Sequence, residues 1–220
     1  MTGASCQPGP SPTARAVRLE GLRAEGPAEL RALLAELPDP PWDVEVVDGD
    51  PLAGPLAAEG FEPYARVAVM ARPVAGLPRP PYVSGLEVMP YRNDWAEEFS
   101  AVEAAAMEGL AAYGEMGRPT GYEGAEGFDA FVAARGEGGL LGFAQAMVPE
   151  GWINWMGVTP GARRRGIGRV LIAEIAKQVV DARGTHLAAT VEVDTAGQAF
   201  LAALGFRERG DRRTLVIRRA

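Results

Sequence analysis

The spacing of apolar residues predicts that strands and helices alternate along most of the chain. Helices are predicted where apolar residues recur every three to four positions, and strands where short apolar runs are bounded by glycine or proline. The predicted helices cover residues 27–37, 95–110, 167–182 and 195–204, with one further helical turn at 55–59. The predicted strands cover residues 44–47, 66–72, 83–91, 131–135, 140–148, 152–158, 186–193 and 214–219. This pattern favours an α/β fold built on a mixed sheet.

Two proline-rich stretches divide the chain. Residues 1–14 are rich in Pro, Ser, Thr and Gly without periodicity, which predicts a disordered tail. Residues 73–82 contain four prolines and are predicted to be a linker. The sequence therefore predicts two units, at residues 15–72 and 83–220.

An internal repeat relates the two units. The first run consists of residues 44–48, 56–61 and 67–72, and the second of residues 191–194, 201–206 and 215–219. Each run has the order strand, helix, Gly-Phe, strand. The repeat predicts that residues 15–72 are a truncated, structural copy of the C-terminal half of the second unit. Coincidence in an alanine-rich sequence is the alternative.

The composition, 47% hydrophobic and 23% charged, is that of a globular protein with a buried core. Cys6 and His186 are the only residues of their kinds, which argues against a disulfide framework, a metal site and a Ser-His-Asp triad. No apolar run is long enough for a membrane span, and the first ten residues lack a signal-peptide pattern. We therefore expect a cytoplasmic protein with no membrane partner.

The net charge of −7 is distributed unevenly. Residues 83–160 carry 3 basic and 12 acidic residues, whereas residues 161–220 carry 12 basic and 6 acidic ones. This asymmetry suggests one surface for an anion and another for a cation, although surface charge also serves solubility.

The most distinctive motif is Arg163-x-x-Gly166-x-Gly168, between a predicted strand and the predicted helix 167–182. Glycines let the backbone approach a ligand closely, and the amides at a helix start attract a pyrophosphate. Further positive charge comes from Arg164, Arg165 and Arg169. The alternatives are a basic turn without a ligand and a nucleic-acid patch, the latter disfavoured by net acidity and a lack of interleaved aromatic residues.

This segment resembles the GNAT superfamily of N-acetyltransferases, whose Arg/Gln-x-x-Gly-x-Gly/Ala signature precedes a long helix. The resemblance covers the order of elements over residues 83–220, and its specific part spans residues 154–206, up to the Gly-Phe pair. It implies a GNAT-like fold with acetyl-CoA as co-substrate and no metal. It also implies a small-molecule or peptide amine as acceptor, and it is compatible with a homodimer.

The resemblance also implies roles for individual residues. The strand end at Met156, Gly157 and Val158 matches the backbone that binds the pantetheine arm next to a bulge. The pyrophosphate loop and helix start match Arg163, Arg164, Arg165, Gly166, Ile167, Gly168 and Arg169. Asp194 stands where the family often has a donor-contacting asparagine.

The catalytic groups that the resemblance implies are incomplete. Leu201 occupies the position of the family's frequent tyrosine acid, and the spacing assigns neither Tyr113 nor Tyr122 as a substitute. Water is an alternative proton source. A neutral amine would attack the thioester while a backbone N–H near Val158 stabilises the oxyanion. Glu192 resembles a glutamate that some members use as the base.

The acceptor side carries negative charge at Glu115, Glu123, Glu126 and Asp129, which favours a cationic acceptor, or is simply a solvated acidic loop. Trp152 and Trp155 either wall the acceptor cleft or belong to the core. An acyl-CoA-binding regulatory protein without catalysis is the competing functional class, because of Leu201 and the half-copy.

Overall fold

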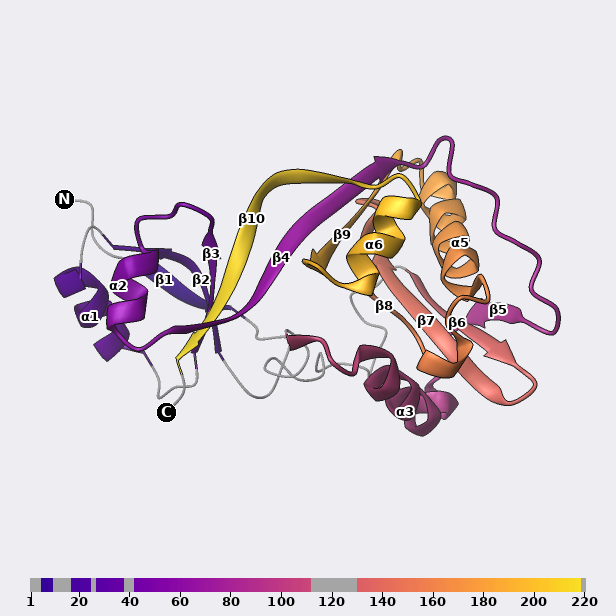
Figure 1. Cartoon of the computed structure of the whole chain (residues 1–220), viewed down its shortest axis with the longest axis horizontal. Helices are drawn as coiled ribbons and strands as arrows, with labels where there is room; N and C mark the ends of the chain where they lie inside the picture. Colours follow the sequence, from indigo (N-terminus) through magenta and orange to yellow (C-terminus); the bar gives the residue numbers. More distant parts are fainter. Residues whose placement is uncertain (1–4, 10–16, 25–26, 38–41, 112–129, 219–220) are drawn as a thin grey trace. The chain divides into compact units, whose positions relative to one another are not determined.

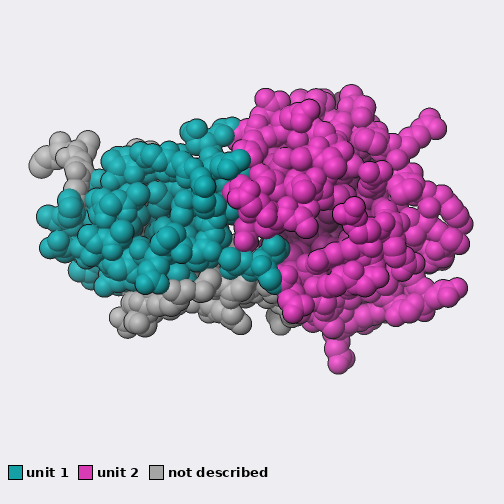
Figure 2. Space-filling view, viewed as in Figure 1, with its two compact units in different colours: residues 1–68, 109–120, 210–220 teal, residues 69–108, 121–209 magenta. Residues whose placement is uncertain are grey.

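The structure is a computed structural model of the 220-residue chain, shown in Figure 1. It describes residues 5–9, 17–24, 27–37, 42–111 and 130–218. Two compact units can be distinguished, coloured separately in Figure 2. Unit 1 comprises residues 1–68, 109–120 and 210–220, and unit 2 comprises residues 69–108 and 121–209. Two long strands, β4 (Glu62–Pro73) and β10 (Arg207–Arg218), therefore contribute residues to both units.

Unit 2 contains a mixed sheet with the strand order β4-β9-β8-β7-β6-β5. Its other strands are β5 (Glu87–Pro90), β6 (Ala130–Gly136), β7 (Gly139–Met147), β8 (Trp152–Val158) and β9 (His186–Glu192). Strands β5 to β8 pair antiparallel, whereas β8 and β9 pair parallel. The helical elements are η1 (Asn93–Trp95), α3 (Ala96–Met107), η2 (Pro160–Ala162), α5 (Ile167–Asp181) and α6 (Ala196–Ala203). The predicted α/β fold with a mixed sheet is confirmed.

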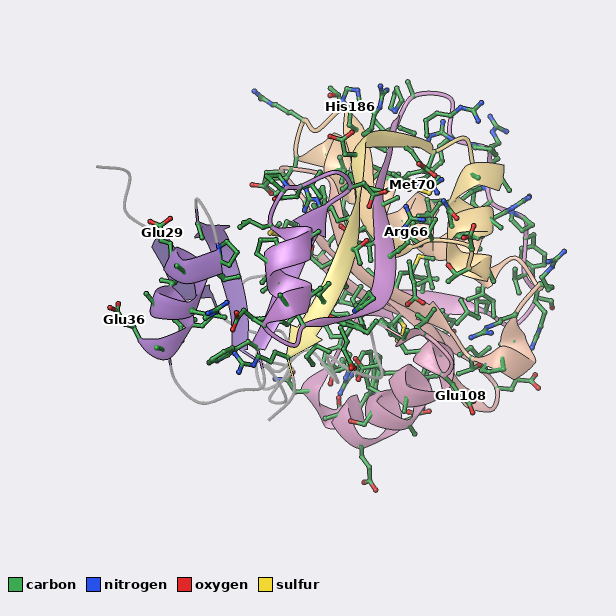
Figure 3. The ribbon with its side chains drawn as sticks, turned by 60° about the vertical axis from the view of Figure 1, so that its left-hand side comes forward. Glu29, Glu36, Arg66, Met70, Glu108 and His186 are labelled. Carbon is green, nitrogen blue, oxygen red and sulfur yellow. The ribbon has the colours of Figure 1, made fainter. Side chains whose placement is uncertain are left out.

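Helices cover both faces of the sheet in unit 2. On one face, α5 buries Leu171, Ile175 and other apolar side chains in a core that β4 joins through Met70. Met70 is labelled on β4 in Figure 3. On the other face, Phe99 of α3 packs edge to face on Phe143 of β7, with ring centroids 4.9 Å apart. Since successive side chains of a strand alternate between faces, β7 serves both cores.

Unit 1 has the strand order β1-β2-β3-β10-β4. Its elements are β1 (Ser5–Gly9), β2 (Val17–Arg23), α1 (Pro27–Ala35), β3 (Trp42–Val47), α2 (Ala53–Ala58) and parts of β4 and β10. Leu30 and Leu34 of α1 pack with Val44 and Val46 of β3 in a small core. The antiparallel partner of β3 is β10, in the register Val44↔Val216.

The predicted repeat is also present in local structure. Gly60 after α2 and Gly205 after α6 have positive φ angles, of 85° and 86° respectively. Phe61 N donates to Leu56 O at 3.0 Å, and Phe206 N donates to Leu201 O at 3.1 Å. Glycine is required at both turns because residues with a Cβ disfavour this conformation. Each run is therefore strand, helix, glycine turn and long strand.

The structure differs from the predicted elements in several places. Strand β4 begins at Glu62 rather than at residue 66, and β5 covers only Glu87–Pro90 of the predicted strand 83–91. Ser5–Gly9, within the predicted disordered tail, form β1, which pairs antiparallel with β2. Neither β1 nor β2 was predicted. The last strand begins at Arg207 rather than at residue 214, because backbone pairing extends it through a polar run that has no apolar alternation. No described helix is long and apolar enough to cross a membrane.

Candidate donor-binding site

Strand β9 pairs with the first residues of β8. Their described parallel pairs are Trp152↔Ala188 and Ile153↔Ala189. The register between β7 and β8 also shifts between Gln145 and Ala146, which marks a β-bulge at this level. A bulge bends its strand and is common next to functional sites. The second half of β8 therefore lies past its described pairing with β9.

The directions of the backbone N–H groups in β8 follow from strand geometry. Thr159 N donates to Leu141 O of β7 at 2.9 Å. Since successive residues direct their amides to opposite sides of a strand, Met156 and Val158 direct theirs away from β7, towards β9. Their N–H groups can therefore bind a ligand inserted beside β8. This is the strand end that the sequence predicted to bind the donor.

The Arg163 turn joins β8 to α5 in an anion-binding geometry. Arg164 and Gly166 have positive φ angles of 65° and 91°. The amides of Gly166, Ile167 and Gly168 lie at the start of α5, where an α-helix offers them no internal acceptor. Amides in this position, together with the positive end of the helix dipole, attract phosphate groups.

The side chains around this turn are positively charged and exposed to solvent. Arg164, Arg165 and Arg169 are exposed. Within the described residues, none of the three forms an ion pair, so their guanidinium groups are available to an anion. The amides and these side chains together fit a pyrophosphate.

Arg163 has a different environment from the other arginines of the turn. Its Nε donates to Val158 O at 3.1 Å, and its Nη2 donates to Ala106 O at 2.9 Å. The side chain thus connects the turn to both β8 and α3. Its predicted contact with the donor remains a prediction, because the observed contacts position the backbone.

Close packing explains both glycines of the motif. A Cβ on Gly166 would lie 2.5 Å from Cγ of Pro81, and a Cβ on Gly168 would lie 3.0 Å from Cζ of Phe200. Gly157 is equally restricted, because its Cβ would lie 2.7 Å from Cβ of Ala106. The α5 start is therefore packed against α6, and β8 against α3.

Two predicted residues lie at the α6 end of β9. Asp194 has a φ of 61° and is exposed in a surface pocket of about 580 Å³ lined by residues of β4, α6 and β10 and of the turn before α6. Glu192 is half-buried, and its carbonyl accepts a hydrogen bond from Thr195 Oγ1 at 2.7 Å. Leu201, at the position of the family tyrosine, is 6% exposed and belongs to the core. The predicted roles of Asp194 and Glu192 remain predictions.

A polar group that the sequence analysis missed lies on the α3 face. Glu103 is fully buried, and its Oε1 accepts a hydrogen bond from Trp155 Nε1 at 2.9 Å. Its sequence signal is its position four residues after Phe99, on the apolar stripe of the helix. Glu115, Glu123, Glu126 and Asp129 lie outside the described residues, as do Tyr113 and Tyr122. Among the residues that the structure does describe, no group of three His, Cys, Asp or Glu could hold a metal.

Comparisons with known proteins agree with the fold. Residues 126–208 match the family model of the acetyltransferase (GNAT) domain. The fold is similar to that of a GCN5-related N-acetyltransferase from Sphaerobacter thermophilus, with TM-score 0.64 and 16% identity over 98% of this chain and 76% of that one. A GCN5-related N-acetyltransferase from Kribbella flavida has TM-score 0.59 and 20% identity, over 93% and 78% of the two chains.

A third similar structure is a tandem GNAT protein from the clavulanic acid biosynthesis pathway. It has TM-score 0.63 and 18% identity, over 96% of this chain and 76% of that one. No curated protein matches the chain. At these identities the structures show a shared fold, and the match at residues 126–208 confirms the resemblance drawn from the sequence.

Proposed function

We propose that the chain transfers an acetyl group from acetyl-CoA to a primary amine, a proposal supported by the match of residues 126–208 to the acetyltransferase (GNAT) domain model. The observation that carries the proposal is the connection made by Arg163 between the anion-binding turn and Val158 of β8. A pyrophosphate at the turn and a thioester arm along β8 would then be held by one continuous surface.

The residues present fit acetyl-CoA, which supplies the activated acetyl group. The amides of Gly166, Ile167 and Gly168 would hold the pyrophosphate, supported by the free arginines of the turn. The N–H of Met156 or Val158 would donate to the thioester oxygen as charge develops there. The amine must lose a proton before it attacks, and Glu192 is the base suggested by the resemblance.

One observation favours a second function. Leu201 is buried in the core at the position where the family often has its tyrosine acid. A protein that binds acyl-CoA as a regulatory ligand without transferring the acyl group would need no such acid. This reading shares the donor site with the first and differs from it in turnover alone.

Binding of the donor is tested by thermal unfolding with millimolar acetyl-CoA. We expect a higher Tm, since a ligand that binds only the folded state stabilises it. Gly168→Asp, which places a negative charge at the start of α5, should abolish the shift. Gly138→Asp is the matched control, because a Cβ on Gly138 meets no atom within 4 Å. Equal Tm shifts in both variants would show that the turn does not belong to the donor site.

Transfer is tested by thiol release from acetyl-CoA in the presence of a panel of primary amines. Amine-dependent release supports the acetyltransferase. A Tm shift without release from any amine supports the regulatory protein instead. No Tm shift at all would contradict both functions.

A further inference from the structure

The described residues include only four buried polar or charged side chains, Asp43, Arg72, Glu103 and Gln145, and two of these lie together on the α3 face. Glu103 is 0% exposed and Gln145 is 2% exposed. Gln145 is the cross-strand partner of Trp155, whose indole Nε1 donates to Glu103 Oε1 at 2.9 Å. We call Glu103, Gln145 and Trp155 the polar cluster.

The polar cluster is set into an otherwise aromatic and apolar layer. Phe99 and Phe143 pack edge to face beside it. Burying a carboxylate is unfavourable compared with burying an apolar side chain of similar volume. Burial alone therefore disfavours a glutamate at position 103, and a buried polar group beside a proposed site is a candidate functional residue.

The polar cluster borders the backbone that is proposed to hold the thioester. Trp155 directly precedes Met156, and the bulge in the β7–β8 ladder falls between Gln145 and Ala146. Trp155 lies on the same face of β8 as Gly157, which abuts Ala106 of α3. An acceptor that approaches the thioester from the α3 face would therefore meet the half-buried indole of Trp155.

The chemistry of this indole suits a cation. The face of a tryptophan ring attracts ammonium groups, more strongly than other aromatic rings do. Glu103 accepts the indole N–H, and a carboxylate in this position adds electron density to the ring. Glu103 also fixes the orientation of the ring, because its buried Oε1 accepts the indole N–H at 2.9 Å.

We propose that Trp155, held and polarised by Glu103, binds the ammonium form of the amine acceptor next to β8. Trp155 is the contact residue, and Glu103 is a positioning residue that acts through it. The inference rests on the proposed function and names the residues that hold its acceptor in the cationic form. The ammonium bound at the ring must release a proton to the base before it attacks the thioester.

The test follows the indole N–H signal of Trp155 by NMR at neutral pH, with the signal assigned from Trp155→Phe. The probes are n-butylamine, a cation at this pH, and the neutral n-butanol. We expect a saturable shift with butylamine and none with butanol. Glu103→Gln keeps an acceptor for the indole N–H but removes the charge, and should weaken butylamine binding about tenfold. Glu97→Gln, an exposed charge on the same helix, should change nothing.

Kinetic measurements distinguish a positioning role of Glu103 from an effect of its substitution on folding. With an amine found in the acceptor screen, Glu103→Gln should raise the KM for the amine while the affinity for acetyl-CoA stays the same. If Glu103→Gln does not fold, Trp155→Leu should lose butylamine binding in calorimetry and keep acetyl-CoA binding. An unmoved Trp155 signal, or equal butylamine affinity of Glu103→Gln and Glu97→Gln, would overturn the inference. Failure of thiol release in the wild type would count against the transferase alone, since the titration does not depend on turnover.

Discussion

Arg163 donates from Nε to the carbonyl oxygen of Val158, 3.1 Å away. Val158 ends the strand proposed to hold the thioester, and Arg163 begins the turn proposed to hold the pyrophosphate. Because Nη2 of the same side chain also binds Ala106 O of α3, the three elements are held in a fixed relation.

Arg163→Lys should therefore weaken acetyl-CoA binding although the charge is kept. A lysine ammonium cannot reproduce the two directions of the guanidinium fork. We expect the Kd for acetyl-CoA to rise about tenfold, the equivalent of one lost hydrogen bond. Arg183→Lys, an exposed arginine after α5, is the control in the same calorimetric titration. Identical Kd values for the two variants would show that the fork is not needed.

Gly166→Ala should reduce both stability and donor binding. Its φ of 91° disfavours a side chain, and its Cβ would meet Pro81 at 2.5 Å. We expect a loss of about 1–3 kcal/mol in the free energy of unfolding, measured in urea. Gly161→Ala, five residues earlier, is the matched control, because its Cβ would meet no atom within 4 Å. A neutral result for Gly166→Ala would mean that the turn relaxes without strain.

Arg72→Met should destabilise unit 2. The buried guanidinium of Arg72 donates to the carbonyl oxygens of Leu204 and Ala75, and so caps the end of α6. Charged hydrogen bonds of this kind contribute about 1.5–3 kcal/mol each, and we expect a loss of about 3 kcal/mol in urea unfolding. The exposed Arg79→Met should cost much less. Similar losses of unfolding free energy in the two variants would contradict a stabilising role of Arg72 at the end of α6.

Tyr91→Phe should make the protein less sensitive to alkaline pH. The hydroxyl of Tyr91 is buried and has no hydrogen-bond partner in the structure described. Burial, and secondarily the charge of Asp94, raises the pKa of Tyr91 above its usual value of 10.0. Since the unfolded tyrosine then loses its proton first, stability falls as the pH rises above about 10.

The phenylalanine variant lacks this loss, and near pH 7 it should gain about 1 kcal/mol by removing the unsatisfied hydroxyl. Urea unfolding at pH 7 and pH 10.5 measures both effects. A parallel decline of wild type and variant with pH would contradict the assignment.

Deletion of residues 1–80 should leave a chain that aggregates or is strongly destabilised. It removes β4 with Arg72 from unit 2, and it removes β3, which pairs with β10 in unit 1. Exposed strand edges and apolar surface favour aggregation. Gel filtration and thermal unfolding check this. A chain starting at Pro81 that is monomeric, equally stable and equally able to bind acetyl-CoA would show an independent appendage.

The sequence predicted well those features that short-range patterns encode. The four-residue apolar spacing from Ile167 placed α5, and the Gly-Phe pairs placed the ends of α2 and α6. The motif from Arg163 to Gly168 placed the turn before α5, because glycine and arginine requirements are local there, and its role in donor binding remains a prediction.

Features that depend on contacts between distant parts of the chain could not be predicted from the sequence. The polar start of β10, from Arg207, is a strand because of its neighbours, and β1 contains Pro8, which disfavours a strand assignment. The contacts of Arg163 with Ala106 and of Glu103 with Trp155 join residues more than 50 positions apart. The sequence analysis missed Glu103, whose only local signal is a carboxylate within an apolar stripe.

The assignment of residues 210–218 to unit 1 has a consequence for synthesis of the protein. On the ribosome, β3 emerges long before its antiparallel partner at Arg213–Arg218, which is made after the whole of unit 2. The first unit to be translated is thus the last that can be completed. Until then β3 can pair with β2 on one side but lacks its partner β10 on the other, so nascent chains stalled before residue 210 should be the species that chaperones and proteases recognise.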